Sequence, residues 1–326
     1  MRVLHTGPNR LGGGLHRGRA RPLPGGGPRV DERQPLPLRR LYEHRHGDRA
    51  DNGLPYRDIT VSSEGLRVGA LVRMSELAAH PDVRSQYPVI AQSLELGASA
   101  QLRNMASIGG NLMQRPRWPY FRDVHSACNR RSPGTGCDAI DGDNRMQAVL
   151  GGSAHCLATH PSDLAVALAA LDAVVHLRGT DGARAVPVAE FFLRPGNTPY
   201  REQDLRPGEL ITSVHVPAGP HTRRSGYLKV RDRQSYEFAL ASAAVALDIR
   251  GGVIRGARVA VGGVATVPWR LPRVERALVG GRPGRATWTE AASRAADGAR
   301  ALSGNAFKIQ LLERTVRRQL TTIGGR

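Results

Sequence analysis

The chain has 326 residues, of which 40% are hydrophobic and 5% aromatic, enough for two or three domains with cores of their own. No stretch approaches the roughly 18 consecutive apolar residues of a spanning helix, so we expect no membrane insertion. The formal net charge is +19, but lysine occurs only at Lys229 and Lys308, and no basic stripe is interleaved with aromatic residues. Because charge alone supports nucleic-acid binding, we do not expect nucleic acid as a partner.

The first 57 residues differ in composition from the remainder. They hold 12 arginine residues against five acidic ones, two GGG runs and no apolar periodicity. This composition predicts a divergent, poorly packed segment over residues 1–57. The N-terminus also lacks the apolar stretch of a signal peptide, so the chain by itself is expected to be cytoplasmic, and any export would be carried by a partner.

From Asp58 onward the sequence becomes periodic. Residues 59–61 and 66–71 predict a β-hairpin, and Ser75 is expected to cap a short helix that ends near His80. A second helix is expected over residues 87–99. Residues 113–157 form a long irregular stretch, and a loop of that length needs something else to fix it.

In the second half of the chain, the predicted strands and helices do not alternate strictly. A helix capped by Ser162 or Asp163 precedes strands near residues 173–177 and 210–216. Two further strands, 238–249 and 253–264, are followed by helices over 272–279, 288–302 and 308–322. Strands followed by helices predict an α+β fold.

The most distinctive local motif is Ser-Ile-Gly-Gly-Asn at residues 107–111. Adjacent amides that no side chain covers can form a partly positive nest for a pyrophosphate, and the two glycines permit close approach. The alternative interpretation is a tight turn between two elements. The residues alone leave both interpretations open.

Three cysteines, Cys128, Cys137 and Cys156, lie within 29 residues of one another in the irregular stretch. An odd number of clustered cysteines favours a metal or cluster site over a disulfide framework. We find no Ser/His/Asp constellation and no motif of paired carboxylates, so no residue is assigned a catalytic role.

Several motifs, in order, resemble the FAD-binding subunits of the xanthine dehydrogenase and aldehyde oxidoreductase (molybdenum hydroxylase) family, most closely those of bacterial periplasmic aldehyde oxidoreductases. They are LRVGALVRMSELAAHP, LRNMASIGGNLMQR, ATHPSDLAVALAALDA, YLKVRDRQSYEFALASAAVAL, GGVATVPWR and GNAFKIQLLERTVRR. The resemblance implies a PCMH-type (vanillyl-alcohol-oxidase-like) FAD-binding domain at 58–220, containing the cysteine loop 113–157. A CO-dehydrogenase-flavoprotein-like α+β domain would follow at 221–326.

The resemblance also implies a set of cofactor contacts. The motif Ser107, Ile108, Gly109, Gly110 and Asn111 would hold the FAD phosphates and ribityl chain. Asp163 would accept hydrogen bonds from flavin hydroxyls, or serve as a helix cap, or do both. Leu210 and Lys229 would lie near the isoalloxazine, and the choice of lysine in an arginine-rich chain favours a compact point charge there.

The cysteine loop resembles a [4Fe–4S] insertion with four cysteines, of which Cys128, Cys137 and Cys156 match the last three. Trp118 stands at the first position, and an indole cannot ligate iron. Either another ligand, such as Asp123 or His125, completes a cluster, or a three-iron cluster forms, or the cluster is lost.

The N-terminus departs from the family pattern, because residues 1–57 contain no second Gly-Gly-Thr-type phosphate loop. An upstream frameshift would produce such a switch at Asp58, and the missing loop would weaken FAD binding.

The function implied by the resemblance is electron transfer within a larger assembly. FAD in this chain would collect electrons from a [2Fe–2S] small subunit, which serves a molybdenum-cofactor large subunit, and deliver them to an external acceptor. Two alternatives remain: a cofactor-impaired structural remnant and a stand-alone flavin oxidoreductase. The substrate would be selected by the molybdenum subunit, and co-export with a signal-bearing partner would place the complex in the periplasm.

Overall fold

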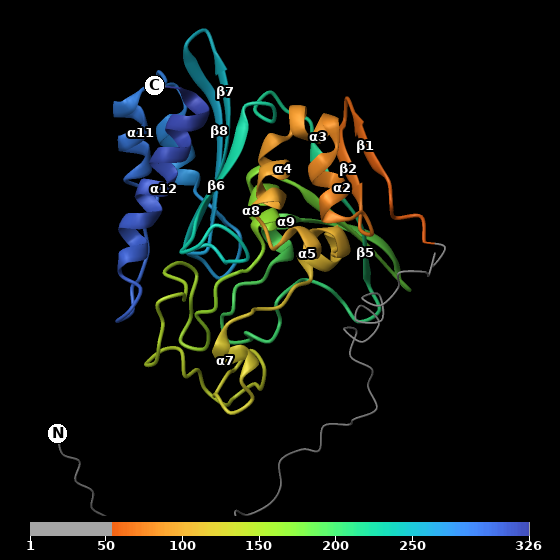
Figure 1. Cartoon of the computed structure of the whole chain (residues 1–326), viewed down its shortest axis with the longest axis vertical. Coiled ribbons are helices and arrows are strands. Elements are labelled where there is room, and N and C mark those ends of the chain that lie inside the picture. The colour runs from red at the N-terminus through yellow and green to blue at the C-terminus, as the bar shows by residue number, and fades with distance from the viewer. Residues whose placement is uncertain (1–53, 326) are drawn as a thin grey trace, which may run out of the picture.

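The computed structural model describes residues 54–325. The predicted divergent segment 1–57 lies outside these residues, apart from its last four. Two antiparallel sheets, each with its own helices, follow one another along the described chain (Figure 1). No helix in residues 54–325 is both long and apolar enough to cross a membrane.

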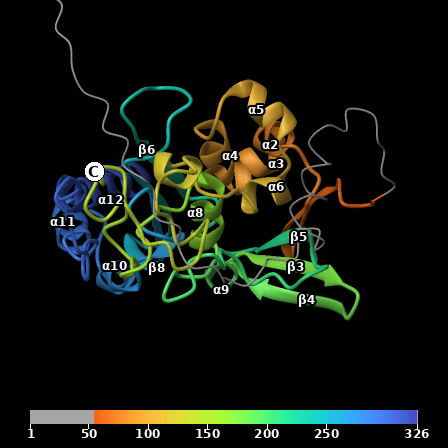
Figure 2. The same ribbon diagram turned by 90° about the horizontal axis from the view of Figure 1, so that it is seen from below.

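The first sheet has five strands in the order β1-β2-β5-β3-β4, and Figure 2 shows it from below, with β3 and β4 at its edge. The predicted hairpin is confirmed, because Ile59 pairs with Val68 and Ser62 with Gly65. The long strand β5 lies between the hairpin and the remaining strands, pairing with β2 on one side and β3 on the other. The strands are β1 Ile59–Ser62, β2 Gly65–Gly69, β3 Val174–Gly179, β4 Gly182–Pro187 and β5 Leu210–Pro217.

Helices cover one face of this sheet. They are α2 Met74–Ala79, α3 Pro81–Gln86, α4 Pro88–Glu95, α5 Ala100–Met105, α6 Ile108–Leu112, α8 Asp163–Ala170 and α9 Val188–Phe191. The short helix α7 Pro119–Arg122 lies apart from the sheet, in the cysteine loop (Figure 1). Two expectations are corrected here. The first helix begins at Met74 after Arg73, not after a Ser75 cap, and the second ends at Glu95, short of residue 99. Proline at the first position of α3 and of α4 starts two separate short helices.

The second sheet has the order β6-β7-β8-β9, with β6 Ser225–Val230, β7 Ala241–Arg250, β8 Val253–Gly262 and β9 Trp269–Arg270. The predicted turn between its long strands is confirmed: Gly251 and Gly252 have φ of 59° and 70°, which a two-residue hairpin requires. The helices α10 Pro272–Leu278, α11 Arg285–Ala292 and α12 Phe307–Gly324 follow. The helix expected over 288–302 is therefore shorter and starts earlier.

Strand β7 joins the two units because both of its faces are buried. Ala244 and Ala246 contribute to the core of the first unit, while Val245 and Leu247 contribute to the core under α12. This follows from the two-residue period of a strand. Helix α8, all of whose residues from Leu164 to Ala170 are buried, packs against β7 and β8, so its N-terminus lies at the junction of the two units.

Candidate functional site

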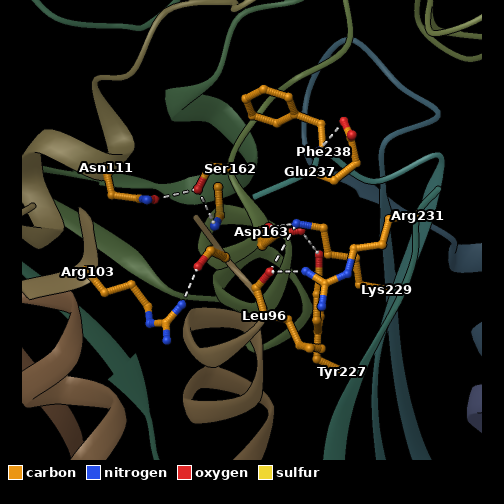
Figure 3. Close-up of polar contacts among 12 residues, drawn as sticks. Leu96, Arg103, Asn111, Ser162, Asp163, Tyr227, Lys229, Arg231, Glu237 and Phe238 are labelled. Atoms are coloured by element: carbon orange, nitrogen blue, oxygen red, sulfur yellow. Dashed lines mark hydrogen bonds and ion pairs between the residues drawn. The ribbon is translucent and has the colours of Figure 1, made fainter. Parts of the chain in front are cut away.

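Three elements that are distant in sequence meet at this junction: the C-terminal end of α4, the N-terminus of α8, and strand β6 (Figure 3). Leu96 is the C-cap of α4, Asp163 is the first residue of α8, and Tyr227 and Lys229 lie on β6. The last two share one face of the strand because they are two residues apart.

The Asp163 carboxylate is bonded through both of its oxygens. One accepts a hydrogen bond from the Tyr227 hydroxyl at 2.7 Å, and the other pairs with the Lys229 ammonium at 2.7 Å. The Lys229 side chain is 1% exposed and that of Asp163 10% exposed, so the pair is shielded from solvent. Burial and the neighbouring carboxylate raise the pKa of Tyr227 well above 10, so its hydroxyl keeps its proton and acts as a donor.

The carbonyl at the C-terminal end of α4 accepts hydrogen bonds from the two cationic side chains of β6 and the residue after it. The Leu96 carbonyl accepts from Lys229 Nζ at 3.1 Å and from an Arg231 guanidinium nitrogen at 3.0 Å. Cations at a helix C-terminus and a carboxylate at a helix N-terminus both have favourable interactions with the helix dipoles. Lys229 is therefore a charge-paired cation that ties β6 to the ends of α4 and α8.

A second contact ties α8 to the Ser-Ile-Gly-Gly-Asn motif. The Ser162 hydroxyl caps α8 by accepting from the Ala165 amide at 3.0 Å, which confirms the predicted cap, and it donates to Asn111 Oδ1 at 2.6 Å. Asn111 therefore contacts Ser162, the residue next to Asp163, although Asn111 and Asp163 are 52 positions apart in the sequence.

The motif itself forms the first turn of α6, with Ser107 as its N-cap. The expected nest of free amides is not present. The Ile108 and Gly109 amides donate to the Val72 and Ala70 carbonyls at 2.9 and 2.8 Å, and the Gly110 and Asn111 amides donate to Ser107 at 3.2 and 2.8 Å. All four amides therefore donate hydrogen bonds within the protein, as the alternative interpretation of a tight turn requires.

Gly110 nevertheless leaves an accessible surface. It is exposed, and a Cβ added to it would meet only the Ser107 hydroxyl, at 3.1 Å. Gly109, by contrast, is packed against Ala70. Among the described residues, the Asn111 side-chain nitrogen has only the thioether of Met74, at 3.5 Å, as its partner. A weak acceptor of this kind leaves the amide able to donate elsewhere.

A narrow crevice opens beside Asp163 at the same junction. Its lining includes Trp118, His160, Ser162 and Phe238. The His160 Nδ1 accepts from the Ser162 amide at 3.3 Å, which places the ring proton on Nε2, and this buried nitrogen has no hydrogen-bond partner among residues 54–325. Burial, aided by the charge of Arg130, lowers the pKa of His160 to about 3, so the ring is neutral.

Leu210 lies in a different sheet from Lys229. It begins β5, is 41% exposed and pairs with Arg178 of β3. Its neighbour Glu209 accepts two hydrogen bonds from Arg184, and these lower the pKa of Glu209 to about 2.

The cysteine loop does not assemble the expected ligand set. Within residues 54–325 no group of three or more His, Cys, Asp or Glu side chains is arranged to hold a metal ion. Trp118, at the position of the missing cysteine, is a core residue that packs on Phe238 at 5.6 Å and donates to the Thr159 carbonyl. The carboxylate of Asp123 is bonded to His125 and Ser126 in the loop. These residues do not fit an iron–sulfur cluster, and we assign none to this chain.

The two units match two family descriptions in order. Residues 52–219 match the FAD binding domain in molybdopterin dehydrogenase, and residues 226–323 match the CO dehydrogenase flavoprotein C-terminal domain. The chain therefore belongs to the FAD-binding medium subunits of the molybdenum hydroxylases, which are oxidoreductase flavoproteins.

The chain is also similar to individual members of this family. The chain is 49% identical over 229 residues to the aldehyde oxidoreductase FAD-binding subunit PaoB of Escherichia coli, covering 70% of each chain. It is 28% identical to the glyceraldehyde dehydrogenase medium chain of Sulfolobus acidocaldarius, covering 68% of this chain and 61% of that one. Among solved structures, carbon monoxide dehydrogenase from Hydrogenophaga pseudoflava shares the fold, with a TM-score of 0.61 at 23% identity over 82% of this chain and 78% of that one.

Two members of the site, Tyr227 and the Leu96 carbonyl, were not predicted from the sequence. Tyr227 stands two residues before Lys229, and the two-residue period of a strand could have placed both side chains toward Asp163. The Leu96 carbonyl left no signal in the sequence, because any residue at the end of α4 would offer the same acceptor.

Proposed function

We propose that this chain binds FAD where α6, the N-terminus of α8 and β6 converge, and that it passes electrons as the flavin subunit of an aldehyde-oxidising molybdenum enzyme. The observation that carries the proposal is the chain of contacts from Asn111 through Ser162 to the adjacent Asp163, and on to Lys229. These contacts bring together the residues that the family resemblance assigns to the phosphates, the ribityl chain and the isoalloxazine ring of FAD.

The described residues fit a dinucleotide in two ways. Gly110 has an open Cα face on which a phosphate can rest, and the Asn111 side chain retains a donor for it. The crevice beside Asp163 contains a buried ring nitrogen of His160 that lacks a hydrogen-bond partner among residues 54–325. Buried polar atoms seldom remain unpaired, so a polar ligand at this junction supplies the missing partner.

Each residue has a defined task in this proposal. Gly110 and Asn111 bind the phosphates, with Ser107 holding the turn, and Ile108 and Gly109 anchor it through their amides. The Asp163–Lys229 pair keeps the N-terminus of α8 in place. Leu210, at the start of β5 in the first sheet, is assigned to the ring system by the family resemblance alone. FAD, when bound, would take up electrons one at a time, as [2Fe–2S] clusters deliver them, and could pass two on to an acceptor. The chain's own residues bind, orient and shield it.

The proposed partners follow from the relatives, which include a medium chain and an FAD-binding subunit. We propose a molybdenum-cofactor large subunit, a [2Fe–2S] small subunit and an external electron acceptor. The iron–sulfur clusters then belong to the partners. Residence in the periplasm would require export with a signal-bearing partner.

The test is an FAD titration of the purified 326-residue chain with a Gly110→Ala variant. The added methyl group occupies the face proposed for the phosphate, so the Kd for FAD should rise about tenfold or more, equivalent to about 1.4 kcal/mol. The unfolding midpoint is measured alongside, because the new Cβ lies 3.1 Å from the Ser107 hydroxyl. Gly284→Ala is the matched control, because nothing lies within 4 Å of a Cβ at this extended position.

Three outcomes separate the proposal from its rivals. Equal affinity of Gly110→Ala and the wild-type chain would contradict the proposed phosphate contact. A wild-type chain that binds no flavin would support a structural remnant. A chain that oxidises an aldehyde without partner subunits would support a stand-alone flavin oxidoreductase.

A further inference from the structure

Two of the three cysteines face each other across a short antiparallel ladder. Cys128 pairs with Cys137, and the pair is flanked on both sides by main-chain hydrogen bonds. The Asn129 amide donates to the Gly136 carbonyl at 2.8 Å, and the Asp138 amide donates to the Ala127 carbonyl at 3.1 Å. The flanking bonds define Cys128 and Cys137 as a non-hydrogen-bonded pair, in which the two side chains come closest.

This register suits a covalent link. The Cα atoms of a non-hydrogen-bonded pair are about 4.5 Å apart, which falls within the range of about 4.4–6.8 Å seen in disulfides. Both cysteines are free thiols in the described structure. We propose that Cys128 and Cys137 are a redox-sensitive pair that closes to a cross-strand disulfide when the chain meets a small-molecule disulfide such as oxidised glutathione.

The loop between the two cysteines holds this register. Asn129 Oδ1 accepts from the amides of Gly134 and Gly136 at 3.1 and 2.9 Å, and the Cys128 amide donates to the Thr135 hydroxyl at 3.2 Å. Both glycines have positive φ, of 86° and 100°, so the tip is a specific turn. Little reorganisation is therefore needed to bring the two sulfur atoms together.

Cys156 also lies near Cys137, whose pKa is raised by burial and by the charge of Cys156, but it has further contacts of its own. Its backbone bridges to Ser153, and its side chain interacts with the buried guanidinium of Arg130, which also pairs with Glu202 at 3.1 Å. Cys156 is 4% exposed, so a soluble oxidant reaches it less readily than the half-buried Cys137. The third thiol should stay reduced.

The reaction is a pair of thiol–disulfide exchanges. The Cys137 thiolate attacks one sulfur of oxidised glutathione, forming a mixed disulfide and releasing one glutathione thiolate, which takes up the proton lost from Cys137. The Cys128 thiolate then attacks the Cys137 sulfur and releases the second glutathione. Two protein thiols are oxidised to one disulfide, and one glutathione disulfide is reduced to two thiols.

Peptide mapping tests the proposal directly. The purified chain is incubated with oxidised glutathione, its remaining thiols are alkylated, and it is digested with trypsin. Cleavage after Arg122, Arg130, Arg131 and Arg145 puts the three cysteines on separate peptides, 123–130, 132–145 and 146–178. Mass spectrometry should find 123–130 linked to 132–145 at least about tenfold more often than any link to 146–178.

Variants give an independent readout. Cys156→Ser should keep the link, whereas Cys128→Ser and Cys137→Ser should each leave a glutathionylated or free single thiol. Dominant links through Cys156, or three alkylated thiols after oxidation of the wild-type chain, would overturn the proposal. Bound iron in the purified wild-type chain that protects all three thiols until a chelator removes it would also overturn it.

Discussion

At the scale of single residues, the Asp163 carboxylate organises the junction between the two units. It is held by Tyr227 and Lys229 from the second sheet, while its own backbone begins α8. Desolvating such a pair is costly, and the three hydrogen bonds that the two charged groups make, to each other, to Tyr227 and to the Leu96 carbonyl, offset that cost. Removing one partner leaves the other charge buried without compensation.

Replacing Lys229 by methionine, or Asp163 by asparagine, should each lower the free energy of unfolding by about 3–5 kcal/mol in urea titrations. The double variant should lose less than the sum of the two by about 1 kcal/mol or more, because it leaves no uncompensated charge. The surface pair Arg84–Glu95, with side chains 55% and 43% exposed, is the control and should couple by less than about 1 kcal/mol. Strict additivity at Asp163 and Lys229 would contradict the account.

The convergence of Asn111, Asp163 and Lys229 could be anticipated only through the family resemblance. Nothing in their spacing indicates it, since the contacts depend on how two sheets pack. The expectation that the Gly109 and Gly110 amides are free was also wrong. The acceptor of the Gly109 amide, the Ala70 carbonyl, is in place only once α6 packs on the end of β2, whereas the Gly110 amide donates to the Ser107 hydroxyl, a local helix cap.

At the scale of elements, α8 depends on its cap. The helix is buried along its whole length between the two units, and its first turn supplies both Ser162 and Asp163 to the site. Ser162 has two tasks, since its hydroxyl accepts from α8 and donates to Asn111 of α6.

Ser162→Ala should therefore destabilise the chain by about 1–2 kcal/mol and also weaken FAD binding, because Asn111 loses its anchor. Ser99→Ala removes the equivalent cap from α5, a helix with no buried residues, and should cost less and leave FAD affinity unchanged. Chemical unfolding and FAD titration of the two variants would check this. Equal effects of both substitutions on FAD affinity would show that the Ser162–Asn111 contact does not matter for binding.

The elements that the sequence predicted well are those with clear periodicity or punctuation. The β1–β2 hairpin, the β7–β8 turn and the helix after Ser162 have alternating residues, glycines and a capping side chain as signals. The short helices α5 and α6 were not predicted, because six or five residues are too few to show a helical period. Helix α6 packs against β2 and β5 of the first sheet, whereas α5 packs against α2.

At the scale of the whole molecule, Lys308 ties three distant segments together. It lies in the first turn of α12, is fully buried, and donates to the Met146 carbonyl in the cysteine loop at 2.8 Å and to the Gly263 carbonyl after β8 at 2.7 Å. Burial, together with the charge of Arg145, lowers the pKa of Lys308 to about 7.

This shift predicts a pH dependence of stability. Between pH 7 and the ordinary lysine pKa of 10.5, the unfolded chain holds a proton that the folded chain has released. Stability should therefore rise with pH across this window, by up to about 1.4 kcal/mol per pH unit from this group. Urea unfolding between pH 7 and 9 should show the slope in the wild-type chain and lose it in Lys308→Met. An unchanged slope in the variant would refute the assignment.

The most direct test of the central claim is an experimentally determined structure of the full chain with FAD bound. We predict that the phosphates lie against the open face of Gly110, within hydrogen-bond distance of the Asn111 side chain, and that the flavin reaches the junction beside Asp163. FAD bound elsewhere, with the Gly110 surface still open and the crevice beside Asp163 untouched, would contradict the account.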